Sequence, residues 1–471
     1  MISSPGSSVH ALGLLFILAL VCAGRVNGAN PWGDRPHLEA ATQAARWLES
    51  VQVKTEHGIA WPVAPDSVET IERNFYSGTP GVILFLLELH RATGEPLYLE
   101  EAKLGADDLL GWLESQDRIG DFGLHTGLAG CGFTLHEVFK TTRNERYLAG
   151  AQRCVDLIRQ HAQTSPQKEG IAWNETTDII SGSAGIGLFL LYAAAEMDDA
   201  ESLQLAFRAG DRLIQMALPV PLDDAEPGLK WFMDRDYPKL FPNFSHGTAG
   251  VCYFLTCLHQ VQPDLEDRSP TGDQDRFLNA ALAGARYLLS IADQSEGRCL
   301  IFHHEPGDEG LFYLGWCHGP VGTSRLFHRL AQVTGEESWM EWVHRGASTI
   351  MTSGIPETRT DGFWNNAGAC CGSAGVASFF LSLHETTGRP EYLDFARKMN
   401  GDIMSRATRV ELEDGRIALK WIHAEHRIQP DLLQAQTGYM QGAAGIGLWL
   451  LQLDAHETGR PFGLSFPDSP F

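Results

Sequence analysis

The sequence is short of positive charge and, beyond its first 30 residues, of long apolar runs. Its 471 residues contain 36 Lys and Arg against 59 Asp and Glu, which gives a formal net charge of −23. A surface with this charge repels phosphate backbones, so nucleic acid is excluded as an expected partner. No segment after residue 30 is long and apolar enough to cross a bilayer, so the body of the chain predicts no stable membrane association.

The N-terminal segment is the exception to this pattern. Residues 11–24, "ALGLLFILALVCAG", form a 14-residue apolar run that the small-residue stretch "RVNGAN" follows. This length is typical of the core of a secretory signal and too short for a membrane span, although the preceding residues contain no Lys or Arg. We therefore expect residues 1–29 to be a signal peptide and the protein to be exported to the periplasm or the extracellular space. The alternative is that the segment is retained as an N-terminal membrane anchor.

Cysteine is scarce, and its number alone decides little. The chain has nine cysteines, of which Cys22 lies in the predicted signal. An even count of eight in an exported protein is compatible with disulfides. A chain with 44% hydrophobic residues can nevertheless build a core without them, and most of these cysteines lie in apolar segments of helical character. We interpret Cys131, Cys154, Cys252 and Cys257 as core residues.

One short motif recurs along the whole chain. A Gly-x-x-Gly pair opens an apolar run of helical length seven times, at intervals of 49 to 72 residues. Such a pair means little alone, but seven in the same context predict a repeat architecture. The copies are "SGTPGVILFLLEL", "TGLAGCGFTLHEV", "SGSAGIGLFLLYA", "HGTAGVCYFLTCL", "HGPVGTSRLFHRL", "CGSAGVASFFLSL" and "QGAAGIGLWLLQL".

A second piece, such as "ATGEPLYLEEA" or "TTGRPEYLDFA", follows several copies and predicts a turn and then an amphipathic helix. The helices that begin at the glycines are apolar on all sides and should be buried, whereas the amphipathic ones should face solvent. An extra amphipathic segment precedes the first copy at 37–51, and none follows the last copy, so the two ends can complete each other. We therefore predict an all-α fold, a seven-fold α/α barrel over residues 30–471, with room for short strands at 219–245, 294–316 and 408–436.

In such a barrel all seven glycine turns lie at one end, at the N-termini of the inner helices. Those termini carry partial positive charge and unpaired backbone N–H groups, so a ligand is expected there. Aligning the copies on their first glycine places Cys317 and Cys370 at equivalent positions, with Cys371 next to Cys370 and His246 one copy earlier. Three converging thiols with one open position suit a divalent thiophilic ion, most plausibly zinc. The alternatives are inert core thiols or a disulfide between Cys370 and Cys371.

Four stretches together carry a resemblance to a known family. "GWCHGPVG", "CCGSAG", "SHGTAG" and "TDIISGSAG" resemble the lanthionine synthetase C-like cyclases, and the resemblance extends over about residues 35–460. It implies a seven-fold α/α barrel with a catalytic Zn²⁺ whose ligands match Cys317 and Cys370. The third family ligand is commonly His, and Cys371 occupies that position here, as in a three-cysteine subgroup.

The resemblance also implies an activity. His246 matches a family histidine that handles protons, and Asp178 matches a family aspartate in the third turn. The implied reaction is the addition of a cysteine thiolate to dehydroalanine or dehydrobutyrine in a peptide, which forms a lanthionine-type thioether. The implied partners are a dehydrated peptide substrate and a separate dehydratase, since the chain has no room for a dehydratase domain. His318, next to Cys317, is not a family ligand and is expected beside the site.

Two other functions are compatible with the sequence. A non-catalytic zinc-containing scaffold that binds peptides or thiols accounts for the cysteines but not for His246 and Asp178 around them. A carbohydrate-active α/α barrel would need paired carboxylates at the mouth, for which Asp178, Glu175, Glu305 and Asp361 are the candidates. Such an enzyme would not need converging thiols.

Overall fold

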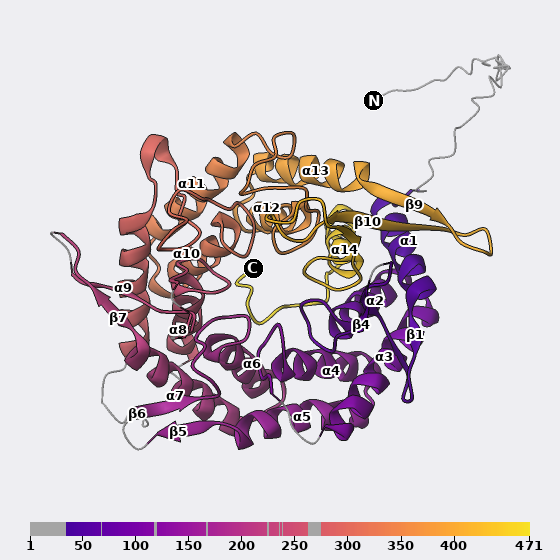
Figure 1. The fold of residues 1–471 in the computed structure, drawn as a ribbon, viewed down its shortest axis with the longest axis horizontal. Coiled ribbons are helices and arrows are strands. Elements are labelled where there is room, and N and C mark those ends of the chain that lie inside the picture. Colours follow the sequence, from indigo (N-terminus) through magenta and orange to yellow (C-terminus); the bar gives the residue numbers. More distant parts are fainter. Residues whose placement is uncertain are drawn as a thin grey trace, which may run out of the picture.

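The helices form two concentric rings, as predicted (Figure 1). The computed structural model describes residues 34–471 except 67, 117–119, 166–167, 224–225, 235, 238 and 262–274, so the predicted signal at 1–29 lies outside the described residues. Among the described residues no helix has both the length and the apolar character that crossing a membrane requires. The inner helices are α2 (Thr79–Thr93), α4 (Leu128–Thr142), α6 (Ser183–Glu196), α8 (Thr248–Val261), α10 (Pro320–Thr334), α12 (Ser373–Thr387) and α14 (Ala443–Thr458). The outer helices are α1 (Pro36–Val51), α3 (Pro96–Ser115), α5 (Glu145–Gln160), α7 (Ala200–Met216), α9 (Arg276–Ile291), α11 (Ser338–Thr352) and α13 (Pro390–Ser405).

The two ends of the barrel complete each other. Each inner helix packs against its two inner neighbours, and α14 packs against α2 to close the inner ring. The outer partner of α14 is α1, so the extra N-terminal helix fills the position that the last copy leaves open. Arg35, just before α1, also pairs with Asp454 of α14, with Nε donating to Oδ1 at 3.0 Å.

A closed ring of backbone hydrogen bonds joins the seven glycine turns. Each turn donates an N–H to a carbonyl of the following turn at 2.8–3.2 Å, and the last turn donates to the first. The links run from Tyr76 to His125, His125 to Ile180, Ile179 to Ser245, Ser245 to Cys317, Trp316 to Cys370, Cys370 to Met440, and Met440 to Tyr76. The positions that the sequence alignment made equivalent are therefore equivalent in space, with a shift of one residue in the third and fifth donors.

The second glycine of each turn is required by close packing. A Cβ atom at Gly185 would lie 2.0 Å from the Ile179 carbonyl oxygen, and one at Gly445 would lie 1.8 Å from that of Tyr439. Both contacts are far shorter than atoms tolerate, so any side chain here would push the turn away from the helix that it begins.

Short antiparallel hairpins follow several outer helices, and the sequence only partly anticipated them. The strands are β1 (Val53–Lys54), β2 (Ile59–Ala60), β3 (Pro62–Ala64), β4 (Val68–Ile71), β5 (Gln163–Ser165), β6 (Lys168–Ala172), β7 (Leu218–Val220), β8 (Gly228–Lys230), β9 (Ala407–Glu411), β10 (Ile417–Ala424) and β11 (Leu433–Ala435). Four of the hairpins carry a buried tryptophan whose indole N–H donates, at 2.6–3.1 Å, to a carbonyl in the last turns of the preceding outer helix. The four tryptophans are Trp61, Trp173, Trp231 and Trp421. These bonds satisfy carbonyls that helix ends otherwise leave unpaired.

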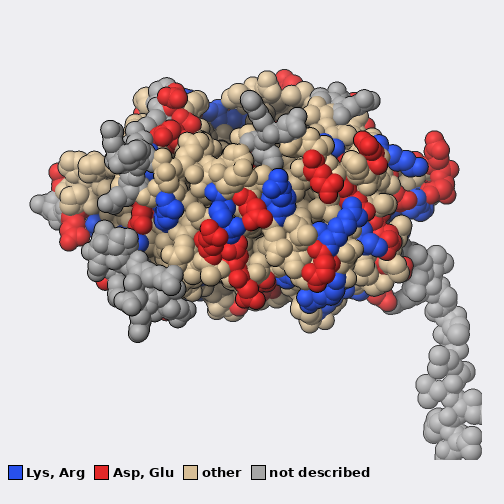
Figure 2. Space-filling view, turned by 90° about the horizontal axis from the view of Figure 1, so that it is seen from below, with Lys and Arg blue, Asp and Glu red and all other residues tan. Residues whose placement is uncertain are grey.

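The outer wall is polar, with acidic and basic side chains interspersed over it (Figure 2). Ion pairs connect neighbouring outer helices, such as Arg146 with Asp107 at 3.0 Å between α5 and α3. One acidic group of this layer is instead buried and forms no ion pair with another described residue, although the charge of Arg416 acts on it. Glu101 of α3 has 7% of its surface exposed, and its burial, with a smaller contribution from Glu49, raises its pKa to about 7.

We expect the pair of substitutions Gly185→Ala and Gly401→Ala to have opposite effects on stability. Gly185 has no room for a methyl group, so its replacement should lower the free energy of unfolding by at least about 2 kcal/mol. Gly401 lies in exposed α13, has nothing within 4 Å of the added atom, and should gain about 0.5–1 kcal/mol in helix propensity. Urea unfolding of both variants measures this, and equal effects would contradict the packing argument.

Replacement of Glu101 by Gln should stabilise the protein at high pH only. The folded-state pKa of about 7 exceeds the ordinary 4.5, so the group's stability contribution is full below pH 4.5 and is lost as pH rises through 7. The variant lacks this loss and should unfold with roughly 1–3 kcal/mol more free energy at pH 8, and with little difference near pH 4.5. Urea unfolding at pH 8, 6.5 and 5 tests this. Glu100→Gln, at an exposed neighbouring position, should show no such pH dependence.

Candidate metal and proton-transfer site

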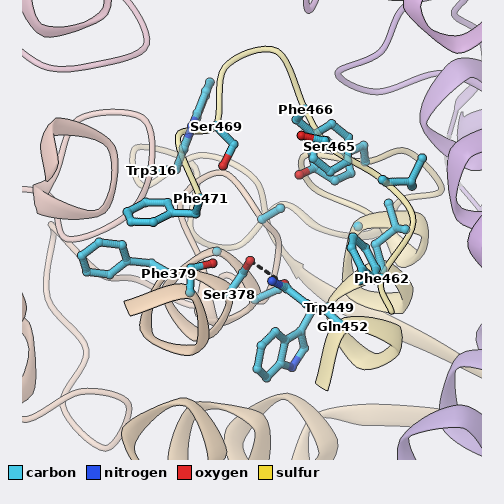
Figure 3. A pocket seen from close by; sticks show the side chains of 18 of the residues that line it. Trp316, Ser378, Phe379, Trp449, Gln452, Phe462, Ser465, Phe466, Ser469 and Phe471 are labelled. Atoms are coloured by element: carbon cyan, nitrogen blue, oxygen red, sulfur yellow. Dashed lines mark hydrogen bonds between the residues drawn. The ribbon is translucent and has the colours of Figure 1, made fainter. Parts of the chain in front are cut away.

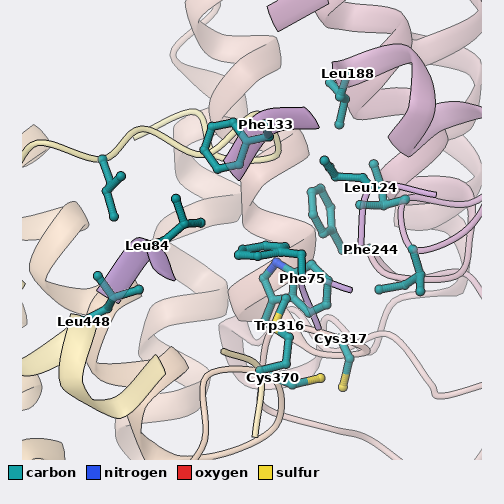
Figure 4. Packing of buried hydrophobic residues seen from close by; sticks show 14 of the residues in the cluster. Phe75, Leu84, Leu124, Phe133, Leu188, Phe244, Trp316, Cys317, Cys370 and Leu448 are labelled. Carbon is teal, nitrogen blue, oxygen red and sulfur yellow. The ribbon is translucent and has the colours of Figure 1, made fainter. Parts of the chain in front are cut away.

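The three predicted cysteines meet at the mouth of the barrel. Cys317 lies in the turn before α10, and Cys370 and Cys371 lie in the turn before α12. The Sγ atom of Cys371 is 3.0 Å from that of Cys317 and 3.3 Å from that of Cys370. All three are buried, and Figure 4 shows Cys317 and Cys370 at the edge of the apolar layer formed by Phe75, Phe244 and Trp316.

The cluster fits a thiophilic metal ion better than either alternative from the sequence. All three cysteines are free, so the predicted alternative of a Cys370–Cys371 disulfide is not what the structure contains. Tetrahedral coordination with Zn–S bonds of about 2.3 Å separates sulfur atoms by about 3.8 Å. The observed separations need to widen by less than 1 Å, and the three sulfurs already lie within 4.8 Å of one another. This buried group could therefore hold a metal ion.

The sequence did not identify two side chains that support the cysteines. Hydrogen bonds from Cys317 and Cys371, and a further one from the Tyr76 hydroxyl, lower the pKa of the Cys370 thiol. Gln441 donates from Nε2 to the Tyr76 oxygen at 3.1 Å and fixes the hydroxyl in place. Tyr76 aligns with Cys317 and Cys370 in the repeat, and Gln441 aligns with Cys371, so their place in the repeat was a signal that could have found them.

His246 and Asp178 form a closely paired dyad beside the cysteines. The Nδ1 atom of His246 is 2.6 Å from Oδ2 of Asp178. The other oxygen of Asp178 accepts backbone N–H groups of Ser181 and Gly182 at 2.9 and 2.8 Å. Asp178 is fully buried, whereas the His246 side chain is 31% exposed. Since a carboxylate only accepts, Nδ1 of His246 carries a proton, and in the neutral ring Nε2 then keeps its lone pair.

A cluster of imidazoles surrounds Phe241 next to this dyad. The rings of His246, His303, His304 and His318 all lie within 6 Å of the Phe241 ring, centroid to centroid. Burial keeps these histidines neutral where a shift occurs: it lowers the pKa of His303 to about 3, and those of His304 and His318 also fall. His318 is therefore beside the cysteines but not among them, as expected. His303 and His304 lie in the loop before α10, outside the register of the repeats, which is why the alignment missed them.

A large cavity lies along the inner helices α12 and α14, on the other side of the layer of turns from the cysteines. It has a volume of about 550 Å³ and is enclosed by α12, α14 and the chain after α14 (Figure 3). No sequence pattern predicts the path of this last segment, which runs into the centre of the ring (Figure 1). Its Asp468 is buried against Arg325, and its Phe471 stacks on His328 with centroids 4.6 Å apart. The bore of the barrel is thus partly filled by the chain itself.

Three of the four carboxylates considered for a sugar-cleaving site are engaged by other groups. Asp178 pairs with His246, and Glu305 binds Lys230 at 2.7 Å and lies 3.3 Å from the Tyr287 hydroxyl. Glu175 approaches Arg212 at 3.6 Å. A glycosidase needs two carboxyl groups free to act on opposite sides of one bond, and these three are each held by another partner.

The comparison with known proteins decides the family. The family profile described as "Lanthionine synthetase C-like protein" matches residues 69–464, most of the chain. The chain belongs to the lanthionine synthetase C-like family.

Relatives and solved structures agree with this assignment. "Glutathione S-transferase LANCL1" of Danio rerio is 22% identical over 328 residues, which cover 68% of this chain and 71% of that protein. The structure of nisin cyclase aligns with 91% of this chain and 96% of its own, at 14% identity and a TM-score of 0.60, and confirms the α/α barrel. An unsaturated glucuronyl hydrolase specific for heparin aligns with a TM-score of only 0.47 and 12% identity, too low to indicate a shared activity.

Proposed function

We propose that this lanthionine synthetase C-like protein is a zinc-dependent enzyme that adds a cysteine thiol to dehydroalanine or dehydrobutyrine within a dehydrated peptide. The observation that carries the proposal is the proximity of a three-thiol cluster and a His–Asp dyad at the barrel mouth of a member of this family. Neither feature is needed to build the barrel, since the other turns are closed without them.

Cys317, Cys370 and Cys371 are the proposed zinc ligands. Zinc in this cluster would lower the pKa of a substrate thiol from about 8.5, so that the thiolate predominates at neutral pH. Tyr76 and Gln441 keep Cys370 oriented and hydrogen-bonded, which favours its thiolate form.

His246 is the proposed proton carrier. Its Nε2 lone pair accepts the proton of the incoming thiol, while Nδ1 remains bonded to Asp178, which holds the ring and stabilises the imidazolium. The C–S bond forms as the C=C bond opens, and the proton returns from His246 to the α-carbon. The net reaction adds S–H across C=C, so no further co-reactant is consumed.

A second thiol source is favoured by one relative. The name of the Danio rerio protein describes a glutathione transferase, in which the thiol comes from a separate molecule. The same chemistry here would add glutathione to a dehydrated peptide. A dehydrated peptide without cysteine, supplied with glutathione, separates this reaction from cyclisation.

The dehydrated peptide substrate would be made by a separate dehydratase. The apolar segment at 11–24 supports export of the protein to the periplasm or extracellular space. The exposed Ile428 and Leu432 lie in the loop between β10 and β11, and the exposed Leu433 begins β11. The same loop carries Arg427, which contacts Tyr313 beside His318. These apolar side chains offer contacts to a peptide at the mouth.

Replacement of His246 by Asn should slow thioether formation by roughly 10²–10⁴-fold without removing zinc. The amide cannot carry the proton, but the three thiolates do not depend on it. Mass spectrometry of a dehydrated peptide over time, with metal analysis of the same sample, makes the measurement. His426→Ala, at an exposed position outside the dyad, should leave the rate unchanged. An unchanged rate in the Asn variant, or loss of zinc together with rate, would contradict the assignment.

Metal binding by the cysteine cluster should depend on whether the residue at position 371 can supply a ligand atom. Cys371→Ala leaves two thiolates and should remove the ion from this cluster, whereas Cys371→His supplies a nitrogen ligand and should retain it. With Co²⁺ as the probe, the near-ultraviolet thiolate-to-cobalt band should disappear in the first variant and persist, weakened, in the second. Retention of the full band in Cys371→Ala would exclude Cys371 as a ligand.

A further inference from the structure

A second group of potential ligands lies close to the cysteines but shares no residue with them. His303, His304 and Asp308 place one ligand atom each within 4.8 Å of one another. The Nδ1 atoms of the two histidines are 2.7 Å apart, and Oδ2 of Asp308 is 3.5 Å from Nδ1 of His304. The backbone holds this geometry, because His304 and Asp308 form an isolated antiparallel bridge in which the Asp308 N–H donates to the His304 carbonyl at 3.3 Å.

The two imidazoles are in hydrogen-bonding contact through their Nδ1 atoms. In two neutral rings, one Nδ1 carries a proton and donates it to the lone pair of the other. When the donor ring carries its proton on Nε2 instead, both Nδ1 lone pairs face one point, where a cation can take the place of the shared proton. His304 is 4% exposed, and the surrounding Phe241 ring lies 5.4 Å away and excludes the solvent that would otherwise compete for the nitrogens.

The charged side chains around His303, His304 and Asp308 leave the Asp308 carboxylate available to bind a cation. Asp308 and Glu309 are the acidic groups beside it, and Arg427 and Lys239 are the basic ones. Arg427 donates from Nη2 to Oδ2 of Asp308 at 3.0 Å and from Nε to the Tyr313 hydroxyl at 2.9 Å. Because Arg427 is held by both of these hydrogen bonds, it orients the carboxylate toward the histidines, and among the described residues nothing donates a hydrogen bond to Oδ1 of Asp308.

We propose that His303, His304 and Asp308 form a second site for a divalent transition-metal ion, independent of the three-cysteine cluster. Metal–nitrogen bonds of 2.0–2.1 Å with tetrahedral to octahedral angles place the nitrogens about 2.9–3.4 Å apart, so the observed pair has to widen by only a few tenths of an ångström. Two imidazoles and one carboxylate are borderline ligands that suit Zn²⁺, Co²⁺ or Ni²⁺ and leave positions open for water or a substrate oxygen.

The position of this site gives it a connection to the mouth of the barrel. The ring of His303 lies 4.2 Å from that of His318, whose neighbour in the chain is Cys317. An ion held here would lie beside the same mouth as the thiol cluster. The proposed thiol addition needs only the cysteine ion, so this second site goes beyond it.

Cobalt titration of the full chain, reduced and stripped of metal, tests the proposal. Thiolate ligands give an intense near-ultraviolet charge-transfer band, whereas nitrogen and oxygen ligands give only weak visible bands. The wild-type protein should bind two equivalents of Co²⁺, of which only one develops the thiolate band. His303→Ala and His304→Ala should each bind one equivalent with that band intact, and Asp308→Asn should weaken the second equivalent roughly tenfold or more.

The band itself reports whether a variant has folded, because Cys317 and the Cys370–Cys371 pair come from different turns. His426→Ala is the matched control, since this exposed histidine adjoins Arg427 and should retain both equivalents. A single equivalent in the wild type, or a second equivalent that survives His304→Ala, would overturn the proposal. Failure of the thiol addition would leave the cobalt count unchanged, so the two proposals fail separately.

Discussion

Each turn that begins an inner helix donates a backbone N–H to the next turn, and the seventh donates back to the first. This closed circuit is the constraint on which the rest of the molecule depends. Backbone bonds of this kind require neighbouring turns to approach within hydrogen-bonding distance, and glycine permits this where Gly123 faces the Ile180 carbonyl oxygen and Gly368 faces that of Met440 in the following turn. The circuit fixes the spacing of the helix N-termini, and with it the positions of every side chain that the turns carry.

The circuit of backbone hydrogen bonds also explains how one site can hold both a cluster of thiols and a His–Asp dyad. Cys317 and Cys370 are joined directly through the backbone, since Trp316 and Cys317 both donate to the Cys370 carbonyl. His246 and Asp178 come from the two turns before them, where a fully buried carboxylate is satisfied by backbone N–H groups and one imidazole. Thiols and a proton carrier are therefore held at fixed separations by the same backbone, without a flexible loop between them.

The sequence predicted what repeats and missed what does not. Seven glycine pairs were enough to predict the barrel, its closure by α1 and α14, and the convergence of Cys317, Cys370 and Cys371. The family resemblance supplied His246 and Asp178, and the structure shows their contact. His303 and His304 lie in an inserted loop whose path depends on long-range contacts, and no periodicity marks them. The packing of Asp468 and Phe471 inside the barrel could not be predicted either, because a short irregular segment has no periodic pattern that indicates where it packs.

The pairing of α1 with α14 has a kinetic consequence. The contact between Arg35 and Asp454 spans 419 residues of chain, and bringing such distant segments together costs about 5 kcal/mol of loop-closure entropy. Until α14 has been synthesised, α1 lacks the inner helix against which it packs, and the inner ring remains an open arc with α2 uncovered on one side. An incomplete nascent chain thus exposes two apolar surfaces, which are complementary to each other and also to those of a second incomplete chain. These exposed surfaces favour aggregation during synthesis, and they become buried only when the ring closes.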